Sequence, residues 1–149
     1  MPSLRDKITN QTAHIAVIGL GYVGLPLATA FAKAGFRVSG IDLDQKKVDA
    51  ITAGESYIPD VLQDELEPHV ESGRLTAASD YEDVGECDAL FICVPTPYDV
   101  QRAPDLSYIN AASRSIMPRL QPGQLVVLQS TTYPGTTEEV VLPILEESG

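Results

Sequence analysis

Three glycine residues follow a short apolar run near the start of this 149-residue chain. The run Ile15–Ile18 is followed by Gly19, Gly21 and Gly24, and more apolar residues come after them. A glycine within regular structure costs about 0.5–1 kcal/mol relative to alanine. The segment therefore predicts a buried strand over 15–19, a tight turn, and a helix that starts where side chains must be absent.

The rest of the chain continues this alternation of strand and helix. We expect further strands at 36–43, 75–79, 89–94 and 125–130, and helices at 22–34, 44–53, 61–72, 106–117 and from 136 onward. Strands that alternate with helices predict a parallel sheet with right-handed crossovers. The expected fold class is α/β, a doubly wound parallel sheet (Rossmann fold). We expect it to form a single domain over 14–149, after an N-terminal extension of residues 1–13 and without the sixth strand of such folds.

Polar residues mark the expected helix ends. Caps are expected at Asp44, at Asp105, at Asp60 with Gln63, and at Thr136 with Glu139. Side-chain oxygens at these positions can accept from the unpaired N–H groups of the first helical turn. Pro143 lies inside the last helix and predicts a kink there, because proline has no N–H to donate.

The composition excludes several classes of protein. Apolar residues make up 44% and charged residues 21%, which indicates a globular domain. Ten basic and 21 acidic residues give a net charge of −11, which disfavours nucleic acid as a partner. The sequence has no apolar segment typical of a signal peptide or a membrane span, so we expect no membrane partner and a cytoplasmic location. Two cysteines without metal-ligand spacing predict neither a disulfide framework nor a metal site.

The spacing of the three glycines has a physical explanation, because they lie between an expected strand and an expected helix. Gly19 permits the tight turn, Gly21 lets the backbone approach a pyrophosphate, and Gly24 lets helix and strand pack closely. The first turn of the helix then offers free N–H groups to the phosphates. Asp42 follows Gly19 by 23 positions, at the end of the second strand, which suits a carboxylate that binds an adenosine ribose. The pattern predicts a dinucleotide site.

Asp42 also bears on which dinucleotide binds. A carboxylate accepts hydrogen bonds from a ribose 2′-hydroxyl but repels a 2′-phosphate, so Asp42 favours NAD over NADP. Lys46 and Lys47 follow it and would either hold a phosphate or form a solvated helix face. NAD is the predicted cofactor, because the carboxylate lies at the strand end itself.

Two further strand ends carry small polar residues and prolines. The segment "VPTPYD" follows the fourth expected strand and contains Pro95 and Thr96, and "QSTTYPGT" at the fifth contains Ser130 and Thr131. Ligands of doubly wound sheets bind beyond the carboxyl ends of the strands. These four residues are therefore candidates for the nicotinamide side of the site, although turn chemistry alone also accounts for them.

Several segments together resemble the UDP-sugar 6-dehydrogenase family. They are "GLGYVGLPLA", "GIDLDQKKV", "CVPTP" with "PDLSYI", and "STTYPGTTEEVVLPILEESG". The resemblance is closest to the UDP-N-acetylglucosamine and UDP-N-acetylmannosamine members, and it runs from His14 onward. It implies an enzyme that oxidises the C6 alcohol of a UDP-sugar to a carboxylate with two NAD, as a homodimer or larger assembly, in polysaccharide biosynthesis.

The resemblance also implies roles for individual residues. Tyr22 and Val23 would contact the pyrophosphate, and Lys47 would lie beside the ribose held by Asp42. Thr96 and Thr131 would line the nicotinamide side, and Thr131 would help to position water near the reacting carbon.

One part of the family pattern is missing from this sequence. The family's nucleophilic cysteine lies in a "GFGGxCxPKD"-type segment, which does not occur here. Cys87 and Cys93 are expected to be structural, so no catalytic residue is assigned and the chain should bind NAD without turnover. Two alternatives remain open. They are a regulatory NAD-sensing module and the cofactor domain of a hydroxyacid or 6-phosphogluconate dehydrogenase.

Overall fold

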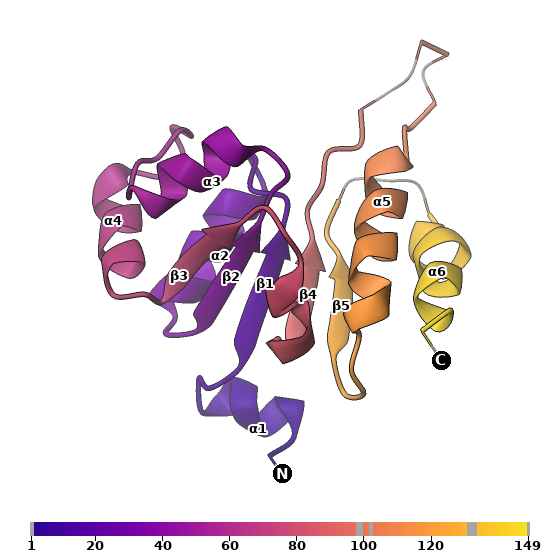
Figure 1. Ribbon diagram of the computed structural model, residues 1–149, viewed down its shortest axis with the longest axis horizontal. Helices are drawn as coiled ribbons and strands as arrows, with labels where there is room; N and C mark the ends of the chain where they lie inside the picture. The colour runs from indigo at the N-terminus through magenta and orange to yellow at the C-terminus, as the bar shows by residue number, and fades with distance from the viewer. Residues whose placement is uncertain (1, 98–99, 102, 131–133, 149) are drawn as a thin grey trace.

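The computed structural model describes residues 2–97, 100–101, 103–130 and 134–148 (Figure 1). Within these residues the centre of the molecule is a parallel sheet of five strands in the order β3-β2-β1-β4-β5. The strands are β1 (His14–Ile18), β2 (Arg37–Ile41), β3 (Leu75–Ala78), β4 (Ala89–Ile92) and β5 (Leu125–Leu128). This confirms the expected fold class, since the order equals the first five strands of the dinucleotide-binding arrangement 3-2-1-4-5-6.

Helices connect the strands and cover both faces of the sheet (Figure 1). They are α1 (Leu4–Thr9), α2 (Gly24–Lys33), α3 (Gln45–Thr52), α4 (Gln63–Glu71), α5 (Ser107–Ile116) and α6 (Leu142–Glu146). Two 3₁₀ turns, η1 (Glu82–Glu86) and η2 (Met117–Arg119), and one π turn, η3 (Thr137–Val141), complete the described elements.

The sheet separates two apolar cores. Strand β1 is buried along its whole length. Its side chains alternate, so Ile15 and Val17 pack with residues of α2 and α4, while Ala16 and Ile18 pack with residues of α5. A strand that is covered on both faces is apolar at every position instead of every second one. This explains the continuous apolar run before the glycines.

Some expected boundaries and caps differ from the structure. Asp44 caps α3 as predicted, with its carboxylate accepting from Lys46 N at 3.0 Å. The cap predicted at Asp105 is displaced by one residue, because α5 begins at Ser107 with Leu106 as its cap, although the Asp105 carboxylate accepts from Ser107 N at 2.9 Å. The capping box of Asp60 with Gln63 is wrong, because α4 begins at Gln63 and Leu62 precedes it as the cap. Val61 is buried, which draws the chain into the core before the helix can start.

The first and last of the predicted helices, which correspond to α2 and to η3 with α6, also depart from expectation. Helix α2 begins at Gly24, two residues later than predicted, and the strands end one or two residues earlier. Thr136 has helical dihedral angles and its side chain makes no capping bond to the helix, so the second capping box is wrong. Pro143 lies in the first turn of α6, directly after the π turn η3, so it does not lie in the interior of a helix as predicted.

The sequence reading missed helix α1. The sequence signal for this helix is the pair Ser3 and Asp6, which forms a capping box. Asp6 N donates to Ser3 Oγ, and Ser3 N donates to the Asp6 carboxylate. Lys7 Nζ lies 2.6 Å from Asp88 Oδ1, and the other oxygen of Asp88 accepts from His14 N at 2.8 Å. This carboxylate therefore ties α1 to the start of β1.

His14 gives the fold a pH-dependent stability. Its ring Nε2 lies 2.7 Å from Ser39 Oγ, and burial, followed by the nearby Arg37, holds the pKa of His14 below its ordinary value of 6.5. Below pH 6.5 the unfolded chain therefore binds a proton that the folded chain resists, so stability is lost as pH falls. One such proton contributes at most about 1.4 kcal/mol per pH unit.

We expect urea unfolding of the unmodified chain to show lower stability at pH 5.5 than at pH 7.5. His14→Gln, which does not titrate, should reduce this difference. His69→Gln on α4 serves as the matched control and should leave it unchanged. An equal pH dependence in all three proteins would contradict this role of His14.

Candidate functional site

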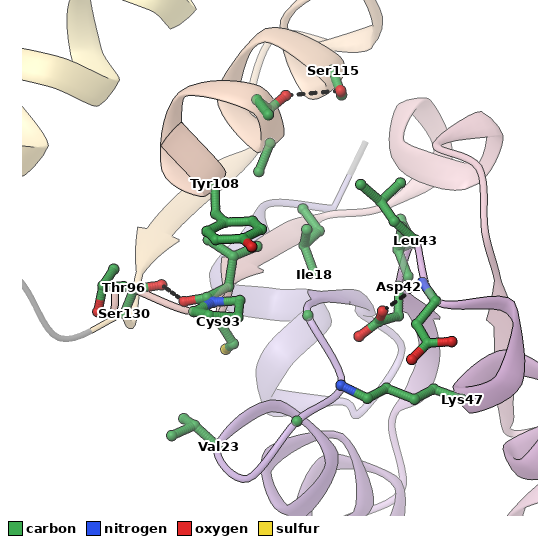
Figure 2. Close-up of a pocket in the computed structure, with 18 of the residues that line it drawn as sticks. Ile18, Val23, Asp42, Leu43, Lys47, Cys93, Thr96, Tyr108, Ser115 and Ser130 are labelled. Carbon is green, nitrogen blue, oxygen red and sulfur yellow. Dashed lines mark hydrogen bonds between the residues drawn. The ribbon is translucent and has the colours of Figure 1, made fainter. Parts of the chain in front are cut away.

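A cleft of about 570 Å³ lies at the carboxyl ends of the central strands (Figure 2). The glycine loop, the ends of β2 and β4, and one face of α5 form its walls. Of the predicted site residues it is lined by Gly19, Gly21, Tyr22, Val23, Asp42, Lys47, Pro95, Thr96 and Ser130. Gly24 does not line the cleft, and Thr131 lies outside the described residues.

The three glycines differ in what the protein itself requires of them. Gly19 has φ +94°, and a side chain there would lie 2.7 Å from the Cys93 carbonyl oxygen. A side chain at Gly24 would overlap the Gly19 carbonyl oxygen, so close packing accounts for that glycine. At Gly21 a Cβ would meet no atom within 4 Å, and φ lies outside the left-handed region. The protein itself therefore does not need a glycine at position 21.

The glycine loop leads directly into helix α2. Leu25 N donates to Gly21 O at 3.1 Å, which starts the hydrogen bonding of α2. The N–H groups of residues 21–24 donate to no described residue. The N-terminus of a helix carries a partial positive charge, and free N–H groups there bind anions such as phosphate. The glycine loop therefore has the features of an anion-binding helix N-terminus.

Asp42 connects the glycine loop to the start of α3. Its Oδ2 accepts from Leu20 N at 2.8 Å and its Oδ1 accepts from Asp44 N at 2.9 Å. Both oxygens keep a free lone pair, because a carboxylate oxygen can accept two hydrogen bonds. The carboxylate is therefore held in one orientation at the end of β2, where it can accept from a sugar hydroxyl.

The two lysines after Asp42 differ in position. Lys47 lines the cleft and reaches from α3 toward the glycine loop (Figure 2). It forms no ion pair with a described residue. Lys46 does not line the cleft. Among the described residues that line the cleft, Lys47 is therefore the basic side chain available to an anionic ligand, in place of the pair considered from the sequence.

The opposite end of the cleft is formed by the segments after β4 and β5. Ser130 Oγ donates to Val94 O at 2.8 Å and so joins the two strand ends. Pro95 and Thr96 lie beside it in the cleft wall. Thr96 and Ser130 have small polar side chains, and they face the same cleft as the glycine loop (Figure 2).

Sequence reasoning missed the wall that α5 provides. Tyr108, Ala111, Ala112 and Ser115 line the cleft, at the i, i+3, i+4, i+7 spacing of one helix face. That spacing of mostly small residues is the signal that could have revealed this wall. Leu43 and Tyr108 line the cleft and are 69% and 47% exposed, so they give it apolar surface.

Both cysteines are buried and poorly suited to nucleophilic chemistry. Burial raises the pKa of the Cys93 thiol to about 11 and that of Cys87 to about 12. Cys87 also donates to Asp83 O at 3.2 Å. A thiol attacks as the thiolate, and reactive cysteines have lowered pKa values. The structure therefore supports a structural role for both.

Comparison with known proteins agrees with this geometry. The family model described as "UDP-glucose/GDP-mannose dehydrogenase family, NAD binding domain" matches residues 13–149. The chain belongs to this family. Its cofactor is NAD, which confirms the prediction from Asp42 and the glycine spacing. This match favours the UDP-sugar dehydrogenase assignment over the two alternatives left open by the sequence, which were an NAD-sensing module and the cofactor domain of another dehydrogenase.

Individual relatives are similar over most of this chain but are much longer. UDP-N-acetyl-D-mannosamine dehydrogenase of Escherichia coli K12 is 45% identical over 130 residues, which are 86% of this chain and 30% of that protein. UDP-N-acetyl-D-glucosamine 6-dehydrogenase of Pseudomonas aeruginosa is 39% identical over 133 residues, or 89% and 31%. The chain therefore spans about a third of the length of these relatives.

Solved structures give the same result. GDP-mannose dehydrogenase of Pseudomonas aeruginosa, crystallised as a ternary complex, matches with a TM-score of 0.85 and 36% identity, over 90% of this chain and 32% of that one. No helix among the described residues is long and apolar enough to cross a membrane.

Proposed function

We propose that the cleft binds NAD with its pyrophosphate on the glycine loop and its adenosine ribose at Asp42. The observation that carries this proposal is the open space at Gly21, together with the N–H groups of residues 21–24, which donate to no described residue. Tyr22, Val23 and Lys47 border the same space. The nicotinamide would then lie toward Pro95, Thr96 and Ser130, with Thr131 as a further predicted contact.

We further propose that the full-length enzyme oxidises the C6 alcohol of a UDP-N-acetylhexosamine to the carboxylate. NAD would accept the hydride in each of two steps. Support comes from the relatives named for UDP-N-acetyl-D-mannosamine and UDP-N-acetyl-D-glucosamine, at 45% and 39% identity. The catalytic thiol would come from outside this chain, because Cys87 and Cys93 are both buried. A homodimer or larger assembly of the full-length enzyme remains part of the proposal.

The role of Asp42 is tested by cofactor preference. We expect the chain to bind NAD more tightly than NADP in calorimetric titrations. Asp42→Ala should weaken NAD binding about 10- to 150-fold, because a hydrogen bond to a charged acceptor contributes about 1.5–3 kcal/mol. The ratio of the dissociation constant for NADP to that for NAD should also become smaller.

Two further variants separate the ribose contact from the support of the loop. Asp42→Asn keeps an acceptor for a backbone N–H but removes the charge, and it should also reduce the preference for NAD. Asp49→Ala removes an exposed carboxylate from α3 and should change neither affinity. Equal or tighter binding of NADP by the unmodified chain would contradict the assignment of Asp42.

A further inference from the structure

Tyr57 lies on the loop between α3 and α4, outside the residues that line the cleft. The loop is held firmly by its own contacts. The hydroxyl of Ser56 lies 2.5 Å from Val61 O and accepts from Ile58 N at 3.3 Å. The side chains of Ile58 and Val61 are buried in the core. These contacts fix the position from which Tyr57 extends.

The Tyr57 hydroxyl donates to Leu20 O at 2.5 Å. Leu20 is fully buried and lies between Gly19 and Gly21. Its N–H donates to Asp42, so the backbone of this residue is held at both its N–H and its C=O. Burial raises the pKa of Tyr57, and Asp42 and Asp44 add to this effect, so the hydroxyl remains a donor.

The geometry of the peptide bond carries this contact to the cleft. In a trans peptide, the C=O of one residue and the N–H of the next point in opposite directions. Holding Leu20 C=O toward Tyr57 therefore also fixes the direction of Gly21 N–H. That N–H is among the unpaired donors of the glycine loop. Glycine rotates freely about its backbone bonds, so this peptide could turn over without such a restraint.

We propose that Tyr57 is a positioning residue for the cofactor pyrophosphate: it fixes the Leu20–Gly21 peptide so that Gly21 N–H stays available to the phosphates. This inference rests on the proposed binding of NAD in the cleft. It assigns Tyr57 no contact with the cofactor itself. Asp42 restrains the preceding Gly19–Leu20 peptide through Leu20 N–H, so the contacts for ribose and pyrophosphate recognition meet at the backbone of one residue, Leu20.

The test compares ligands with and without a pyrophosphate. Tyr57→Phe keeps the ring in place and removes only the hydroxyl. We expect its dissociation constants for NAD and ADP to rise about two- to tenfold, the range expected for one neutral hydrogen bond. The dissociation constant for adenosine, followed by NMR titration, should stay unchanged. The Gly21 amide signal should respond to ADP more weakly in the variant than in the unmodified chain.

Thr52→Val is the matched control, because it removes a hydroxyl that donates to Val48 O within α3, away from the glycine loop. It should leave the affinities for all three ligands unchanged. Unaltered ADP binding by Tyr57→Phe, or an equal loss for adenosine, would overturn the role of Tyr57 alone. Failure of the unmodified chain to bind both NAD and ADP would overturn the proposed function together with this inference.

Discussion

Replacing Gly21 with valine is expected to abolish NAD binding and to leave the domain folded. A Cβ at this position meets no protein atom within 4 Å, and the backbone is not in the left-handed region, so the folded chain accommodates a side chain. The same side chain would occupy the space that a pyrophosphate needs in order to reach the free N–H groups of residues 21–24. We expect no measurable binding in a calorimetric titration that gives a clear signal for the unmodified chain.

Two other glycines make this result interpretable. Gly85→Ala is the matched control, since Gly85 has an ordinary φ, lies in η1 and has only a 3.4 Å neighbour. It should bind NAD normally. Gly24→Ala should instead lose its cooperative thermal unfolding, because the added carbon would overlap Gly19 O. Normal NAD affinity in a folded Gly21→Val protein would show that the ligand binds elsewhere.

A polypeptide of these 149 residues is expected to form no NADH from any UDP-sugar, even with NAD bound. Oxidation of an alcohol to a carboxylate takes two hydride transfers, and the intermediate aldehyde has to be retained between them. The family resemblance implies that a cysteine thiolate does this, and such a nucleophile needs a lowered pKa. With the Cys93 pKa at about 11, only about one thiol in a thousand is ionised at pH 8.

The assay follows NADH absorbance with UDP-N-acetylglucosamine, UDP-N-acetylmannosamine and UDP-glucose in turn. Sustained turnover that persists in Cys87→Ser and Cys93→Ser would contradict both the need for a thiol and the proposed chemistry. Turnover that is lost only in Cys93→Ser would show that this cysteine is reactive. In that case only its structural role would be wrong.

Local sequence patterns predicted the parts of the cleft that depend on local geometry. Gly19 and Gly24 are dictated by a turn and a close contact a few residues apart, and Asp44 caps the helix that directly follows it. Asp42 could be found because the distance along the chain from the first glycine reflects one strand–helix–strand unit. Each of these signals lies within a single such unit.

The parts that the sequence did not predict depend on contacts between distant segments. Tyr57 acts on Leu20, which lies 37 positions away, and nothing in the residues around Tyr57 indicates that contact. The spacing of small residues on α5 marks one helix face, but only the crossover, which packs α5 against residues of β1 and β4, shows that this face lines the cleft. The false cap at Asp60 shows the reverse case, since burial of Val61 overrode a good local capping pattern.

The two backbone bonds of Asp42 restrict how cofactor preference can be re-engineered in this domain. A variant that accepts NADP needs to lose the negative charge that repels a 2′-phosphate. It also needs an acceptor for Leu20 N and Asp44 N, because the present carboxylate holds both. A single substitution by a small or basic residue removes the repulsion and frees the glycine loop at the same time. A successful redesign would therefore restore the loop support with a second substitution.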